Sequence, residues 1–328
     1  MTMKRRTFLL SAAAACGGAL RVSPARAQTA GATPLTIVIP FAAGGASDLL
    51  PRLLAEGLAR ELGRPVVVEN KGGAGGLIAA GLVGRAAADG QTLLYGNQGQ
   101  MVVARHLYPA NGPEPRTVLM PLTLAARTQF FLLVPSSSPL SSATVLAGAG
   151  RAAPLKVGIP GIGSPPHLAM LLLGELTGAA IEPIPYQGSA PLLVDLIAGR
   201  LDAAFDNVAT SHPHVRAGRL RALGVSGMKR AAVAPSVPTL AEAGIDGFAY
   251  QSWQGFFAPK GTPAEVTAGL VAALHKALAD PAVRDRLAEV GLEVAVGTPL
   301  DFEALIARDA EEWDRRIRRG LVQPALTR

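Results

Sequence analysis

The sequence from residue 35 to residue 62 reads LTIVIPFAAGGASDLLPRLLAEGLAREL. It opens with a short apolar run that is typical of a buried strand, and a glycine pair at 44–45 follows the run. After the glycines, Leu50, Leu54 and Leu58 recur at the spacing of one face of a helix. The stretch therefore predicts a strand, a tight turn and a helix, which is the repeating unit of an α/β protein.

The same alternation of apolar runs and helical stretches continues along the chain. We expect further strands at 66–69, 92–95, 130–134, 156–159, 184–186, 203–205, 222–225 and 256–258, and helices at about 76–88, after Ser164, after Ser189, at 263–279 and at 300–318. This order predicts an α/β fold whose open sheets hold mostly parallel strands covered by helices.

The length of the chain predicts two domains, because a single hydrophobic core does not usually serve roughly 300 residues. The strand at 130–134 ends in a Ser/Pro loop at 135–139, which is a candidate for the passage into a second domain. We expect the final helices to return to the first domain. Domain 1 is then 28–129 with 253–328, domain 2 is 130–252, and a ligand cleft lies between them beside two crossover segments.

Residues 1–27 have the pattern of a removable export signal. Three basic residues at 4–6 precede an uncharged stretch at 7–20, and an A-R-A cleavage pattern ends at Ala27. The stretch is shorter than the roughly 20 residues that cross a bilayer, so export to the periplasm with cleavage near Ala27 is favoured over anchoring. The paired arginines favour the twin-arginine route, with the general secretory route as the alternative. Lipidation at Cys16 is not favoured, because a better cleavage site lies downstream.

Composition argues against several classes of function. The leader holds five basic residues and no acidic one, so the formal charge of +7 falls to +2 for the mature chain, with 26 basic residues against 24 acidic ones. This balance predicts no nucleic-acid partner, and we interpret the basic run at 315–319 as the solvated face of a terminal helix. Cys16 is the only cysteine and lies in the leader, so the mature chain has no thiol for a nucleophile, a disulfide or a metal.

Three loops have the composition of an anion site. Glycines precede a predicted helix at 40–48, 161–167 and 186–191, and none of these segments contains Lys or Arg. In open α/β sheets, ligands bind beyond the carboxyl ends of the strands, where all three loops are expected. The first amides of a helix lack intrahelical partners and carry the positive end of its dipole, so they can hold a carboxylate without a cationic side chain. We expect the three loops to converge on one cleft.

Each loop also has a structural explanation. Ser47 or Asp48 would cap the first helix, and Ser164 and Ser189 would cap the two later helices. Asp48 and Asp206 are acidic, so they either meet an ammonium group on the ligand or serve as capping and loop residues.

The same two possibilities apply to two ring-bearing side chains. His167 lies in the first turn after Ser164 and either faces the ligand or packs, whereas Trp253 walls the cleft or belongs to the core. If the amides from Gly45 to Ser47 hold the anion, we expect Gly45→Val to impair binding, because a branched side chain blocks the approach and resists a positive φ.

The motifs of common enzymes are missing. The glycine run at 72–76 is not followed by the Gly-Lys-Ser/Thr of a phosphate loop, and the chain has no G-x-S-x-G elbow. His212 and His214 flank Pro213, but the sequence indicates no third metal ligand. These features favour a binding protein without cofactor or metal over an enzyme.

Nine segments together carry a family likeness. They are PFAAGGASD (40–48), RPVVVENKGGAGG (64–76), DGQTLLYG (89–96), GSPPHL (163–168), PYQGSAP (185–191), FDN (205–207), GRLRALGV (218–225), VPTLAEAG (237–244) and FAPKGTP (257–263). In these segments the chain resembles the Bug receptors, the TctC-like extracytoplasmic solute receptors of tripartite tricarboxylate transporters. The segments span nearly the whole mature chain.

The resemblance implies a type II periplasmic-binding-protein fold, in which two α/β domains close on a small carboxylate ligand. It also implies delivery of the ligand to a two-component membrane permease, with no catalytic step. We expect a monomer. At matching positions the resemblance nominates as ligand-binding residues Phe41, Gly44, Gly45, Ala46, Ser47, Asp48, Gly163, Ser164, His167, Tyr186, Gly188, Ser189, Asp206 and Trp253.

Two departures from the family pattern make the expected pocket more apolar. The segment 159–164 reads IPGIGS where the family often has a further hydroxyl, and Val102, Val103 and Ala104 replace a polar stretch. They favour a less polar or aromatic carboxylate over citrate. The alternatives to a transport receptor are a receptor that signals to a membrane sensor and an exported enzyme on the same fold.

Overall fold

The computed structural model describes residues 33–41 and 43–321. The predicted export signal, with its cleavage site and Cys16, lies outside these residues. Within them, no helix combines the length and the apolar composition that spanning a bilayer requires.

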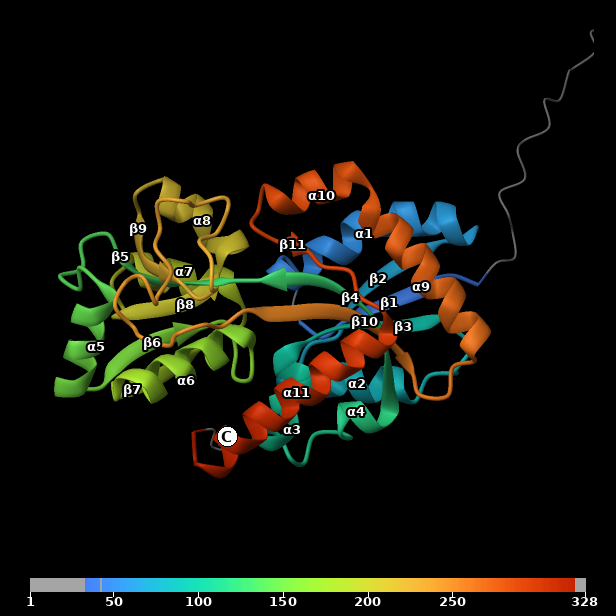
Figure 1. Cartoon of the computed structure of the whole chain (residues 1–328), viewed down its shortest axis with the longest axis horizontal. Helices are drawn as coiled ribbons and strands as arrows, with labels where there is room; N and C mark the ends of the chain where they lie inside the picture. The colour runs from blue at the N-terminus through green and yellow to red at the C-terminus, as the bar shows by residue number, and fades with distance from the viewer. Residues whose placement is uncertain (1–32, 42, 322–328) are drawn as a thin grey trace, which may run out of the picture. The chain divides into compact units, whose positions relative to one another are not determined.

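Six strands form the first sheet: β1 (Leu35–Ile39), β2 (Val66–Asn70), β3 (Thr92–Asn97), β4 (Leu119–Thr128), β10 (Ser252–Pro259) and β11 (Glu293–Val294). Their order is β11-β4-β10-β3-β1-β2 (Figure 1). β1 runs parallel to both β2 and β3, whereas β10 lies antiparallel between β3 and β4.

The helices that accompany the first sheet are α1 (Ala46–Leu62), α2 (Leu77–Gly84), α3 (Ala104–Leu107), α4 (Pro115–Val118), α9 (Ala264–Ala279), α10 (Pro281–Ala288) and α11 (Pro299–Arg318), with a 3-10 turn at Ala74–Gly76 and a π-helix at Gly99–Val103. Successive residues of a strand point to opposite faces. Ile37 accordingly packs with the leucines of α1 and α9, and Val38 packs with α2 on the other face. The helices therefore cover both faces of the sheet.

Five strands form the second sheet: β5 (Phe130–Pro135), β6 (Leu155–Ile159), β7 (Ile181–Pro185), β8 (Ala203–Asn207) and β9 (Leu220–Val225). The accompanying helices are α5 (Ala143–Ala152), α6 (Pro165–Thr177), α7 (Ser189–Ile197) and α8 (Val208–Arg216). The strand order is β7-β6-β8-β5-β9, with β6 parallel to β7 and β8, and β5 antiparallel to β8 and β9. In the first sheet β11 is also antiparallel to its neighbour β4. In both sheets the fourth strand, counted from β2 or from β7, is antiparallel to the strands on either side of it.

That antiparallel strand is, in each sheet, the one that arrives from the other sheet. Only Gln129 separates the end of β4 from the start of β5. In the return crossing, the Tyr250 amide donates to the Ser226 carbonyl at 2.7 Å, and Ser252 pairs with Thr128 at the start of β10. The two crossings therefore run side by side. We call residues 33–128 with 252–321 the first lobe and residues 130–250 the second lobe.

The α/β class and most predicted elements are confirmed, with three differences. The loop at 135–139 follows β5 inside the second lobe, so the passage between the sheets lies at Gln129 and not in that loop. The sequence interpretation missed β4, α5, α8, α10 and β11, and α2 ends at Gly84 instead of near residue 88.

The terminal helix α11 also contacts the second lobe. Its Arg316 guanidinium forms an ion pair with Glu175 of α6 at 2.8 Å and lies 5.4 Å from the ring centre of Trp313. Arg315, Arg318 and Arg319 are exposed. The basic run at 315–319 is therefore a solvated face except at Arg316, whose ion pair connects α11 to α6 of the second lobe.

Candidate ligand-binding site

The first predicted loop connects β1 to α1. Gly44 has a φ of 84°, in the left-handed region that favours glycine, whereas Gly45, the N-cap of α1, is extended with a φ of −82° and a ψ of 171°. Any residue can adopt the conformation of Gly45. The prediction that Gly45 needs a positive φ is therefore wrong, and the turn requires glycine at position 44 instead.

Asp48 braces this loop and does not cap the helix by bonding to an amide of its first turn. Its carboxylate accepts hydrogen bonds from the Gly44 amide at 3.2 Å, from Arg52 at 2.8 Å and from Asn70 at 3.0 Å. Asn70 also donates to the Phe41 carbonyl at 3.0 Å. Burial alone would raise the pKa of Asp48, but the hydrogen bonds from Arg52 and Asn70 hold it below its ordinary value. The loop is therefore tied to α1 and β2 around an ionised, paired carboxylate.

We predict that Gly44→Ala will destabilise the protein and Gly45→Ala will not. An alanine forced into the left-handed region costs roughly 1–2 kcal/mol, whereas alanine in an extended backbone gains up to about 1 kcal/mol through the unfolded state. Urea unfolding of the two variants measures the difference in the free energy of unfolding. Equal unfolding midpoints would contradict the loop geometry.

Ser47, in the first turn of α1, points toward β10, the strand by which the chain returns to the first lobe. Its Oγ accepts a hydrogen bond from Gln254 of β10 at 3.3 Å, and the buried Gln254 accepts from the Tyr95 hydroxyl at 2.6 Å. The start of α1 is thereby connected to the centre of the first sheet.

The second loop lies between β6 and α6, and Ser164 caps α6 as predicted. Its Oγ accepts from the His167 amide at 3.4 Å and donates to the Gly161 carbonyl at 2.7 Å. His167 is buried, and its Nδ1 accepts from the Gly163 amide at 3.1 Å, so the proton of the neutral ring lies on Nε2. Burial lowers the pKa of His167 from 6.5 to about 4. The ring is therefore uncharged at neutral pH.

The third loop lies between β7 and α7, and here the capping prediction is wrong. Gly188, with a φ of 101°, is the N-cap of α7, and Ser189 is the first helical residue. The Ser189 hydroxyl donates to Asp206 of β8 at 2.6 Å, and the Thr210 hydroxyl donates to the other carboxylate oxygen at 2.6 Å. Asp206 is fully buried, and burial raises its pKa to about 6 although both hydrogen bonds oppose the rise.

The structure brings the second and third loops together. The Tyr186 amide donates to the Ile159 carbonyl at 2.9 Å, and the Gly188 amide donates to the Pro160 carbonyl at 3.2 Å. The Tyr186 hydroxyl turns away to Asp195 at 2.8 Å. Among residues 33–41 and 43–321, no hydrogen bond joins the first loop to either of the other two.

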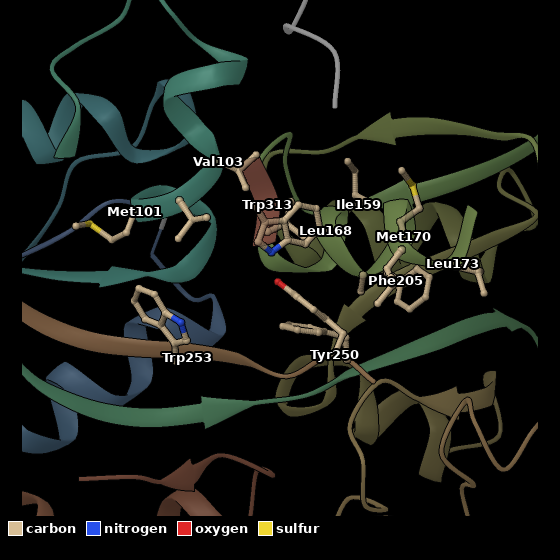
Figure 2. Packing of buried hydrophobic residues seen from close by; sticks show 14 of the residues in the cluster. Met101, Val103, Ile159, Leu168, Met170, Leu173, Phe205, Tyr250, Trp253 and Trp313 are labelled. Carbon is tan, nitrogen blue, oxygen red and sulfur yellow. The ribbon is translucent and has the colours of Figure 1, made fainter. Parts of the chain in front are cut away.

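The π-helix after β3 meets the second loop from the first lobe. A Cβ atom placed on Gly99 would lie 2.1 Å from the Gly163 carbonyl oxygen, so the two backbones touch only because Gly99 has no side chain. Val102 and Val103, two of the apolar departures, are buried in the hydrophobic cluster that also contains Leu168 of α6 (Figure 2).

Trp253 belongs to the core. It is fully buried in β10, its ring packs edge-on against Phe302 at 5.0 Å, and its Nε1 donates to Asp309 of α11 at 2.7 Å. Figure 2 shows its indole well apart from Tyr250 of the return crossing.

Sequence reasoning missed the network that Asp309 joins. Gln98, which precedes the π-helix, donates to Asp309 at 2.7 Å and accepts from the Tyr250 hydroxyl at 2.7 Å. Nothing in the sequence singles out Asp309 of α11, or Gln98, which lies 211 positions earlier in the chain. The network fixes the loop after β3 to the return crossing and to α11.

A cavity of about 120 Å³ lies beside this network. Arg127, Tyr250, Trp253, Arg308 and Trp313 contribute to its lining, and none of the three glycine loops does. The cavity therefore lies apart from the three glycine loops, and Trp253 is the one nominated residue in its lining. The described part of the chain contains no group of three His, Cys, Asp or Glu side chains placed to hold a metal, so His212 and His214 have no third ligand there.

Comparison with known proteins identifies the chain. Residues 50–321 match the family of the tripartite tricarboxylate transporter family receptor. The chain belongs to this family. Among its relatives, BugT of Bordetella pertussis is 34% identical over 299 residues, which cover 90% of this receptor and 92% of BugT.

Two solved structures extend the comparison. Rpa4515 of R. palustris, solved with adipate, is 34% identical with a TM-score of 0.83 and covers 89% of this receptor and 99% of its own chain. MatC of Rhodopseudomonas palustris, solved with bound malate, is 33% identical with a TM-score of 0.78 and covers 86% and 98% of the two chains. Similar structures are periplasmic binding proteins, which confirms the predicted fold. The chain is a solute-binding receptor and not an enzyme.

Proposed function

We propose that this receptor captures a small carboxylate in the periplasm and delivers it to the two-component membrane permease of a tripartite tricarboxylate transporter. One observation carries the proposal: the loops after β1, β6 and β7 each lead into the start of a helix and contain no cationic side chain. Helix-start amides suit a carboxylate without such a side chain. The adipate and malate bound by two similar proteins support the same ligand class.

The start of α1 is the proposed anion site of the first lobe. The amides of Gly44 and Asp48 are already engaged within the loop, which narrows the donors to residues 45–47. Arg52 pairs with Asp48 at 2.8 Å, so the nearby carboxylate does not stand as an uncompensated negative charge beside the ligand. The loops at 161–164 and 186–189 are the proposed contacts from the second lobe.

Closure of two domains on the ligand is part of the proposal, with domain 1 at 28–129 and 253–328 and domain 2 at 130–252. The paired crossings at 128–130 and 250–252 would serve as the hinge. Export with cleavage near Ala27 places the mature receptor in the periplasm, where the family's permease can receive the ligand.

A thermal-shift screen of the mature chain against small carboxylates tests this function. A ligand at 100 times its Kd stabilises the folded state by about 2.7 kcal/mol, which raises the Tm of a protein of this size by several degrees. We expect at least one dicarboxylate or aromatic carboxylate to do so, with matched uncharged amides as controls. No shift with any carboxylate, or equal shifts with the amides, would argue against the proposal.

A further inference from the structure

Asp206 is a buried carboxylate that accepts hydrogen bonds from two hydroxyl groups. It lies in β8 with no solvent exposure, and Ser189 and Thr210 each donate to it at 2.6 Å. Within residues 33–41 and 43–321, no Lys, Arg or His forms an ion pair with Asp206. The negative charge is therefore held by the two hydroxyl groups and by hydrogen bonds from Asn207, and both hydroxyl groups are oriented by it.

This orientation fixes what Ser189 can offer to a ligand. A serine hydroxyl has one hydrogen and two lone pairs, and an ionised carboxylate only accepts. Because the hydrogen of Ser189 is directed to Asp206, its Oγ retains only acceptor capacity. A ligand carboxylate is also acceptor-only, so it cannot bond to Ser189 without breaking the short bond to Asp206.

Ser189 nevertheless stands in the proposed site. It is the first residue of α7, next to Gly188, whose amide bonds to the loop after β6. Thr210 Oγ1 also lies 3.4 Å from Ser189 Oγ, but its one hydrogen is directed to Asp206 at 2.6 Å, so Ser189 Oγ accepts nothing stronger than that long contact. A ligand that supplies a hydrogen to Ser189 gives this buried oxygen a full hydrogen bond. We propose that Ser189 Oγ accepts a hydrogen bond from the ligand, so the preferred carboxylate carries a hydroxyl or ammonium donor that meets the second lobe. This inference rests on the proposed function of carboxylate capture.

Calorimetric titration with matched ligand pairs tests the inference at pH 8, where Asp206 is ionised. The pairs are malate and succinate, mandelate and phenylacetate, and lactate and propionate, which differ by one hydroxyl group, with aspartate as the ammonium counterpart of malate. We expect the hydroxylated member of the best-bound pair to bind about three- to tenfold more tightly, as one neutral hydrogen bond allows. A larger gain for aspartate than for malate would identify the donor as an ammonium group.

Two serine variants separate a ligand contact from a structural effect. Ser189→Ala should bring the affinity ratio within a pair close to one. Ser164→Ala is the matched control, because its hydroxyl donates to the Gly161 carbonyl, and it should weaken both members by a similar factor. Equal affinities within every pair for the wild-type protein would overturn the inference and leave carboxylate capture intact. Absence of binding by all seven compounds would overturn both.

Discussion

Replacing Asp206 by Asn should make the receptor lose about 2 kcal/mol of stability relative to the wild-type protein as the pH falls from about 6.5 to about 4.5. Replacing His167 by Asn should have the opposite result, a gain of about 2 kcal/mol over the same interval. The asparagine at position 167 supplies an acceptor oxygen in place of Nδ1 for the Gly163 amide.

The reason is that two buried groups titrate in this interval with opposite signs. The pKa of Asp206 is raised from 3.8 to about 6, so the folded protein takes up a proton that the unfolded chain does not, and acid stabilises the fold. The pKa of His167 is lowered from 6.5 to about 4, so the unfolded chain takes up the proton first, and acid destabilises the fold. The contributions of these two groups nearly cancel each other in the wild-type protein. Each variant removes one contribution, so the other appears in the difference from the wild-type profile.

Urea unfolding at a series of pH values measures these slopes. Asp246→Asn is a control, because Asp246 is an exposed carboxylate and its loss should leave the wild-type profile unchanged. Parallel profiles for the wild-type protein and both buried-site variants would show that the titration of Asp206 and His167 does not differ between the folded and unfolded states.

Gly99→Ala should cost about 1–3 kcal/mol of stability, or more, and should weaken ligand binding. The new methyl group would lie 2.1 Å from the Gly163 carbonyl oxygen, and overpacking against rigid surroundings has costs of this size. The opposing atom belongs to a backbone that His167 and Ser164 hold in place, so it cannot move away cheaply. The clash is relieved only if the π-helix moves away from the loop between β6 and α6. That movement displaces one side of the proposed site.

A second glycine provides the control for this substitution. Gly269 lies inside α9 with no atom within 4 Å of an added Cβ, so Gly269→Ala should stabilise the protein by up to about 1 kcal/mol through helix propensity. Urea midpoints and ligand affinities of the two variants are to be compared with the wild type. A Gly99→Ala protein as stable as Gly269→Ala would contradict the close contact between the lobes.

The sequence predicted those parts of the fold whose signal is local. The run from β1 into α1 has a clear strand, a glycine pair and helical leucines, and it forms as expected. β4 reads LMPLTLAART, with an internal proline and mostly residues that also suit a helix, so its strand state depends on pairing with β10. α5 contains two glycines in ten residues, which hides its helical character.

The candidate site was predicted in composition and not in detail. Glycine and serine positions located three loops that each follow a strand and enter a helix, but sequence does not reveal which glycine of a pair has a positive φ, as Gly44 and Gly45 illustrate. Ser189 was interpreted as a cap because its partner, Asp206, is supplied by another strand. The contact between Gly99 and Gly163 depends on two lobes meeting, and no local pattern indicates it.

The most direct test of the account is a calorimetric titration of the mature chain with its best carboxylate ligand and with the uncharged primary amide of that ligand. Hydrogen bonds from backbone amides to a charged group are worth about 1.5–3 kcal/mol each, so we predict that the carboxylate binds at a single site at least about tenfold more tightly than the amide. Equal affinity for the two compounds, or binding that requires an arginine outside the three loops, would contradict a carboxylate held by helix-start amides.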